Sequence, residues 1–204
     1  MFKKGFTLAE VLVTLGLVGV ITAIVTPNLL NLLPDRNKMI VLKLYKNIST
    51  ITQEIMNDTG YYYPNGTCIG LECHDMPLKI DRLPQYSDNS AYGDIRKYGL
   101  IFCSKMLIED KCNIDTKKID FTTIDSMDWT VSHYTITVDL NGEDAPNCTY
   151  QKTSCKKPDQ FQFIVQGKTG EVHGSDPLTR AYLQNPNKLN NKKEDFKNAD
   201  LYSN

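Results

Sequence analysis

The chain lacks an excess of either charge. Its 204 residues hold 23 Lys and Arg against 24 Asp and Glu, which gives a formal net charge of −1. A protein that binds nucleic acid through the phosphates needs a strongly basic surface. The composition therefore indicates no nucleic-acid partner.

Recognisable catalytic motifs are also missing. The histidines His74, His133 and His173 are scattered, and neither a G-x-S-x-G nucleophile motif nor a glycine-rich phosphate loop occurs. His133 falls in a strand-like pattern, where a packed or surface role is the ordinary one. We therefore expect that the protein is not an enzyme.

Charged residues and histidine are absent from residues 11–34, a span of 24 residues. A helix with a rise of about 1.5 Å per residue would be roughly 36 Å long over this span, which exceeds a hydrocarbon core of about 30 Å. Glu10 stands at the edge of the apolar run, where burying a charge is costly unless it has a partner. We predict a membrane-spanning and assembly helix over 6–34, in which Glu10 has a functional role.

The residues around Glu10 resemble the start of a type IV prepilin or type II secretion pseudopilin, on the basis of the stretch Lys3-Lys4-Gly5-Phe6-Thr7-Leu8-Ala9-Glu10. The resemblance implies that a prepilin peptidase/methyltransferase removes a leader, 1–5, by cleaving after Gly5, and methylates the new amine of Phe6. It also implies that Glu10 pairs with the Phe6 amine of an adjacent subunit, as a registry device. Ala9 departs from the family, which usually has a larger aliphatic residue there. An ordinary secretory signal would have a shorter apolar run followed by a small-residue cleavage site, and neither is present.

The same resemblance implies an α+β, pilin-like fold, in which a long N-terminal helix packs against an antiparallel β-sheet head. The implied partners are other pilin or pseudopilin subunits, an inner-membrane assembly platform and membrane lipid. The chain is then single-pass in the inner membrane, with its N-terminus cytoplasmic and its head extracytoplasmic. A type IV pilus and a type II secretion pseudopilus both stay open. So does a membrane-anchored extracytoplasmic ligand-binding protein that does not polymerise.

Helical periodicity continues beyond the apolar run. An amphipathic helix is predicted over 35–59 because apolar residues recur there at spacings of three or four, at Ile40, Leu44, Ile48, Ile51 and Ile55. Pro27 and Pro34 predict a bend or break within 26–35.

A globular head is predicted over 60–184. It begins with a stretch rich in turn-forming residues, 60–90, which indicates a long irregular connection. A helix is expected within 91–109, with one face formed by Ile95, Tyr98, Phe102 and Met106.

Strand patterns fill the second half of the head. Alternation of apolar and polar residues over 129–140 and 160–165, followed by a turn at 167–170, predicts an antiparallel sheet. The last segment, 185–204, is dominated by Asn, Lys and Asp, and we expect it to be a mobile polar tail.

Cysteine is absent from the first 67 residues, and all six cysteines lie in the predicted head. The sequence cannot choose among the possible pairings, but proximity favours Cys68–Cys73, Cys103–Cys112 and Cys148–Cys155. An even count suits disulfides in an extracytoplasmic head. Zinc binding, suggested by Cys73-His74, and free thiols are the alternatives; no C-x-x-C pair supports a zinc module.

One acidic turn resembles the opening of a calcium loop. Asp139, Asn141 and Asp144 supply oxygen side chains around Gly142, but Tyr150 stands at the twelfth position, where an EF-hand needs glutamate. Some secretion pseudopilins bind calcium in a head loop, so the resemblance supports calcium without a residue-level match. The alternative is an Asx turn that leaves the strand. We expect no other cofactor.

Overall fold

The computed structural model describes residues 7–32, 35–62, 78, 82–83, 93–115, 117–150, 155–189 and 192–203, with side chains for all of them except 24–32, 93–95 and 192. Within these residues the chain forms helices α1 to α5 and strands β1 to β6, and all the strands belong to one antiparallel sheet. The α+β, pilin-like class predicted from the sequence is confirmed.

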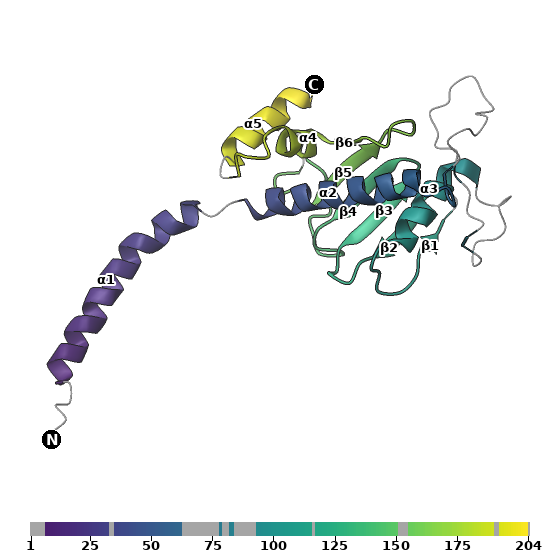
Figure 1. Cartoon of the computed structure of the whole chain (residues 1–204). Coiled ribbons are helices and arrows are strands. Elements are labelled where there is room, and N and C mark those ends of the chain that lie inside the picture. Colours follow the sequence, from purple (N-terminus) through teal and green to yellow (C-terminus); the bar gives the residue numbers. More distant parts are fainter. Residues whose placement is uncertain are drawn as a thin grey trace.

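Two helices form the N-terminal part of the chain, α1 (Leu8–Leu32) and α2 (Arg36–Asn57). In Figure 1, α1 extends away from the rest of the molecule, whereas α2 lies along the sheet. The first helix continues through Pro27, and the boundary between the helices falls inside the range predicted for a bend or break; Pro34 lies outside the described residues. Within the described part of the chain, no helix is both long enough and apolar enough to cross a membrane. The predicted segment 6–34 reaches beyond that part at both ends.

Helix α2 begins at an N-cap. The side chain of Asp35 accepts a hydrogen bond from the backbone N–H of Asn37 at 3.1 Å, which satisfies one of the free donors of the first turn. The helix ends where the backbone N–H of Asp58 donates to the carbonyl of Glu54.

The inward face of α2 is rotated from the predicted one. Ile40 and Ile51 are only partly buried, whereas the fully covered positions are Lys38, Val41, Leu44, Ile48, Thr52 and Ile55. Two polar side chains can occupy this face because each has a buried partner. The Lys38 ammonium pairs with a carboxylate, and Thr52 Oγ1 lies 2.8 Å from the hydroxyl oxygen of Tyr98.

The sheet is a meander in which each strand pairs with the next in the chain. Its strands are β1 (Asn113–Ile114), β2 (Ile119–Thr122), β3 (Asp128–Ser132), β4 (Thr135–Asp139), β5 (Gln160–Val165) and β6 (Val172–Gly174). Alternate residues are buried, including Ile136 and Val138 of β4 and Phe161 and Phe163 of β5. The opposite face is polar; there Thr130 donates to Asp120 across the strands at 2.7 Å. The sheet therefore has one core face.

The predicted strand over 129–140 is in fact a hairpin. Strands β3 and β4 pair in register from Ser132 opposite Thr135 to Asp128 opposite Asp139. His133 lies in the turn with a φ of 57°, in the left-handed region, and not in a strand as the alternation suggested.

Helix α3 (Gly93–Ser104) covers the β2–β3 side of the sheet, in contact with α2. Its Tyr98 and Phe102 are fully buried, as the predicted face requires, and Phe102 packs against Phe121 and Trp129. These aromatic rings form the centre of the core. Most of the predicted irregular connection, 60–90, lies outside the described residues. Within its described part, Tyr62 and Leu78 form an isolated antiparallel β-bridge.

Two C-terminal helices complete the head, α4 (Pro177–Gln184) and α5 (Lys192–Tyr202). Helix α4 contacts α2, β5 and β6, and α5 packs on α4. The prediction of a mobile polar tail over 185–204 is wrong for the described part of that segment, because Ala199 is fully buried and Asp195 is 1% exposed. The head therefore continues beyond residue 184, its predicted end.

Candidate functional site

The first turn of α1 is closed by reciprocal hydrogen bonds between Thr7 and Glu10. The backbone N–H and the hydroxyl of Thr7 each donate to Glu10 Oε2 at 2.8 Å, and the backbone N–H of Glu10 donates to Thr7 Oγ1 at 3.3 Å. This is a capping box, in which two free donors of the helix end are satisfied by side chains three residues apart. The Glu10 carboxylate also lies at the positive end of the helix dipole. The carboxylate thus has partners within its own chain.

Large apolar side chains are exposed on every side of α1 between Leu8 and Ile21. Leu8 is 80% exposed, and the large apolar residues from Val11 to Ile21 are 45 to 66% exposed, at Val11, Leu12, Val13, Leu15, Leu17, Val18, Val20 and Ile21. These positions lie all around the helix, so packing one face of α1 against the head would leave the others exposed. A helix that is hydrophobic all round is normally buried in protein or lipid. The described part of α1 therefore needs surroundings that the described residues of the head do not provide.

Two disulfides close short loops in the head. Cys103 is bonded to Cys112, nine residues on, and Cys148 to Cys155, seven residues on. They coincide with two of the three pairs that proximity favours. Cys68 and Cys73 lie outside the described residues. None of the described cysteines is free.

The acidic turn after β4 has the geometry of an Asx turn. Asp139 accepts from the backbone N–H of Asn141 at 3.2 Å and from the Gln160 amide at 3.0 Å, while the Asn141 amide donates to the Asp144 carbonyl at 2.8 Å. Burial raises the pKa of Asp139 above its ordinary range. Across the part of the chain that the structure describes, no group of three or more His, Cys, Asp or Glu is placed to hold a metal ion. Calcium at Asp139, Asn141 and Asp144 stays a sequence-based prediction.

A neighbouring carboxylate, that of Asp159, fixes the start of the loop closed by the Cys148–Cys155 disulfide. Asp159 accepts from the backbone N–H groups of Asn147 and Cys148, both at 2.9 Å. These bonds attach the loop that contains Cys148 to the start of β5. The carboxylates at this end of the sheet are thus used in fixing loops.

The comparison with protein families identifies the N-terminal segment. Residues 1–26 match the family model described as the prokaryotic N-terminal methylation motif. The chain carries a prepilin-type signal. No curated protein and no solved structure matches the chain.

The prepilin-type signal contains the residues that the sequence predicts to take part in processing and assembly. Gly5 and Phe6 lie within the matched segment but outside the described residues, so the structure places Glu10 and not the amine predicted to pair with it. Pro27 follows directly after the matched segment. The signal covers the N-terminal part of the chain only and carries no information about the head.

Sequence reasoning missed Thr7 as the partner of Glu10. The signal was present, because T-x-x-E before an apolar run is the pattern of a capping box. It also missed Asp176, whose Oδ1 accepts from the backbone N–H groups of Leu178 and Thr179 at 3.0 Å and so caps α4. Asp176 followed by Pro177 was the corresponding signal, since proline is common in the first turn of a helix.

Proposed function

We propose that the chain is a pilin-like structural subunit that is cleaved after Gly5, methylated on the amine of Phe6 and polymerised through α1. The observation that carries the proposal is the prokaryotic N-terminal methylation motif at the start of a helix that is apolar on every side. Processing requires a prepilin peptidase/methyltransferase. Before assembly the chain spans the inner membrane over 6–34, with its N-terminus cytoplasmic and its head outside; afterwards α1 is buried among other subunits.

Glu10 has different partners before and after assembly: Thr7 of its own chain first, and then also the Phe6 amine of an adjacent subunit. In the single subunit the Glu10 carboxylate accepts from Thr7, so it enters the membrane interface with its hydrogen bonds satisfied. Cleavage then creates a cationic amine on Phe6 of each chain. During assembly the carboxylate pairs with that amine on an adjacent subunit, so an attraction between opposite charges joins the charge-assisted hydrogen bonds from Thr7.

Processing is tested by substituting Gly5. The full chain is produced in a membrane together with a prepilin peptidase, and intact-protein mass spectrometry follows the loss of residues 1–5 and the gain of one methyl group. Gly5→Val is expected to block both changes, because a branched side chain obstructs the bond that is cut. Gly16→Ala is the matched control, since a Cβ at Gly16 meets no atom within 4 Å. Cleavage of the Gly5→Val chain at the same bond would contradict the proposal.

Assembly is tested at Glu10 with two variants that separate charge from capping. Glu10→Gln keeps an oxygen that can accept from Thr7 but removes the charge, whereas Thr7→Ala removes the capping hydroxyl and keeps the charge. Both variants are expected to insert in the membrane. Glu10→Gln is expected to assemble poorly, and Thr7→Ala to assemble better than Glu10→Gln, as measured by filament yield. The reverse order would assign Glu10 to helix capping alone.

The type of filament is a separate question. A type IV pilus and a type II secretion pseudopilus use the same processing and the same assembly helix. Pilus motor and retraction genes beside this gene would favour the first, and a secretion operon the second. An anchored protein that binds a ligand without polymerising would instead show processing with no crosslinks between copies through α1.

A further inference from the structure

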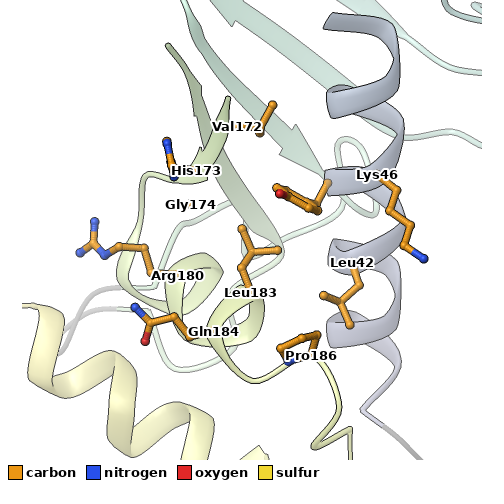
Figure 2. Close-up of a pocket in the computed structure, with 10 residues that line it drawn as sticks. Leu42, Lys46, Val172, His173, Gly174, Arg180, Leu183, Gln184 and Pro186 are labelled. Carbon is orange, nitrogen blue, oxygen red and sulfur yellow. The ribbon is translucent and has the colours of Figure 1, made fainter. Parts of the chain in front are cut away.

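A cavity of about 490 Å³ opens at the edge of the sheet between α2, β6 and α4. Its apolar lining comes from Leu42 and Tyr45 of α2, Val172 of β6 and Leu183 of α4. Figure 2 shows Leu42 and Leu183 facing each other across the space between the two helices. We name this the β6-edge pocket. Strand β6 is the last strand of the sheet, so the pocket lies at an edge that no further strand of the described chain covers.

The rim of the β6-edge pocket is basic. Lys46 of α2 is exposed, and Arg180 of α4 stands on the other side of the pocket; in Figure 2 their charged ends point away from the apolar centre. Arg180 is held in place, because its guanidinium donates to the carbonyls of Ser175 at 2.6 Å and Tyr202 at 3.2 Å. These are neutral acceptors, so the positive charge of Arg180 is not cancelled by them.

His173 adds a third basic group to the rim, with an adjacent acid. Its side chain is 51% exposed, and Nε2 lies 3.8 Å from a Glu171 carboxylate that is itself 62% exposed. Lys46 and Arg180 supply the positive charge of the rim.

A second surface has the opposite character. Leu107, after α3, is 74% exposed and Ile124, in the β2–β3 turn, is 64% exposed. The backbone N–H of Ile124 donates to the carbonyl of Leu107 at 3.2 Å, so the two residues lie side by side. We name them the apolar pair. Single exposed apolar residues are ordinary, but two neighbouring ones on separate loops form a small apolar patch.

The apolar pair is flanked by acidic residues. Glu109, Asp110 and Asp125 are exposed beside it in the chain. The bases of these flanks are Lys111 and Lys105, and Lys105 is paired with Glu54 at 3.7 Å. An apolar centre with a negative border thus matches, in kind and in sign, an apolar pocket with a positive border. Complementary charge of this type fixes the orientation of two surfaces.

The two surfaces cannot meet within one chain. The apolar pair lies at the end of β2 and the pocket at β6, four strands away in the sheet. At about 4.8 Å between strands, this separation is roughly 19 Å. Contact between them therefore requires a second molecule. A contact between two different surfaces of identical subunits repeats in one direction and produces an open row unless its rotation closes a ring.

We propose that the apolar pair of one head enters the β6-edge pocket of a second copy of this chain. The acidic flanks of the pair then lie against Lys46 and Arg180. This inference rests on the proposed function, since it names the contact between heads that accompanies polymerisation through α1. It assigns the β6 edge to a subunit interface.

The contact is tested by photocrosslinking of the full chain, processed and assembled in its membrane. A p-benzoylphenylalanine replaces Ile124, and the crosslinked peptides are identified by mass spectrometry. Crosslinks from position 124 to the peptides that contain Leu42 or Leu183 of a second copy are expected. The same label at Ile164, which is 42% exposed on β5, is the control and is not expected to reach those peptides.

Charge reversal gives an independent measure of the same contact. Lys46→Glu is expected to lower the crosslink from position 124 several-fold, and adding Asp110→Lys and Asp125→Lys to that chain is expected to restore it. Lys43→Glu, at an exposed position on α2 outside the pocket lining, is the matched control. An unchanged midpoint of unfolding confirms that each variant still folds.

A label at Leu12 in α1 separates the two proposals. If Leu12 crosslinks subunits while position 124 reaches a different protein or another part of the head, the inference is wrong and the proposed function stands. If neither label crosslinks two copies, polymerisation itself is contradicted. Crosslinks from position 124 to the pocket that ignore all charge reversals would overturn the role of Lys46 and the acidic flanks.

Discussion

The buried ion pair between Lys38 and Asp195 fastens the C-terminal helix to the start of α2. Lys38 Nζ lies 2.6 Å from Asp195 Oδ2, and the side chains are 0% and 1% exposed. The same ammonium donates to the Lys188 carbonyl at 3.0 Å. Asp195 Oδ1 is buried and has no hydrogen-bond partner among the described residues. We predict that removing the lysine alone strongly destabilises the head.

The magnitude follows from what Lys38→Met leaves behind. The Asp195 carboxylate stays buried with neither oxygen paired, and breaking a buried pair in this way costs about 3–5 kcal/mol. Total stabilities of domains are about 5–15 kcal/mol. With a denaturant slope of about 2 kcal/mol/M in urea, a loss of about 4 kcal/mol lowers the midpoint by about 2 M. Replacing both partners, as Lys38→Met with Asp195→Leu, removes the unpaired charge and is expected to restore most of the loss.

The assay is urea unfolding of the full chain in nonionic detergent. Trp129 is the only tryptophan of the chain and is 2% exposed, so its fluorescence reports on the core of the head. Lys43→Met, at an exposed position on the same helix, is the matched control and is expected to change stability by less than about 0.5 kcal/mol. A midpoint for Lys38→Met within the error of that control would refute the reasoning. So would a double variant that is as unstable as the sum of its single changes.

Three further predictions use the same assay. Replacing Cys103 and Cys112 with serine opens a loop of nine residues. In the chain-entropy model this is expected to lower the free energy of unfolding by at least about 2.5 kcal/mol, and a smaller loss would contradict the disulfide. Asp176→Ala removes the cap of α4 and the acceptor of the Gln162 N–H at 2.8 Å, so we expect a loss of about 2–4 kcal/mol, part of which Asp176→Asn recovers. Burial raises the folded-state pKa of Asp139 above its ordinary 3.8. The contribution of this group to stability therefore falls as the pH rises from 3.8 through the raised pKa. Asp139→Asn is expected to flatten the dependence of stability on pH in that range, and an unchanged slope would contradict the burial argument.

Local patterns in the sequence predicted the elements whose cause is local. The helices α1 and α2 follow from apolar composition and from periodicity, and β5 from strict alternation, because burial of one face imposes a repeat that can be counted. The two described disulfides are local as well, since their partners are nine and seven residues apart. The hairpin at His133 was missed although a signal existed. The buried apolar positions are odd-numbered in β3, at Trp129 and Val131, and even-numbered in β4, at Ile136 and Val138, and such a change of parity marks a turn.

Distant contacts explain what the sequence did not predict. Lys38 is fully buried because its partner is 157 residues away, and no count along α2 could assign a lysine to the inward face. Thr52 is buried through Tyr98, 46 residues away. Helix α5 looks like a solvated tail because its composition is polar, but residues far away in the chain attach it to the head. Besides Lys38, Tyr150 contacts it twice: the ring of Tyr150 packs against Phe196, and its hydroxyl donates to Asp200 at 2.7 Å.

These distant contacts gather where the chain passes from α1 into the head. The hydroxyl of Tyr182 on α4 donates to Asp35 Oδ2 at 3.1 Å, and the backbone N–H of Asp35 donates to the Leu189 carbonyl at 3.1 Å. Burial and the nearby Asp35 raise the pKa of Tyr182, which keeps its hydroxyl protonated as the donor. With the Lys38–Asp195 pair one turn further on, α2 is bound to the C-terminal segment from its first residues. In the filament that we propose, a load carried by α1 would enter the head through α4 and α5 as well as through α2, which gives the polar C-terminal segment a mechanical reason to be ordered.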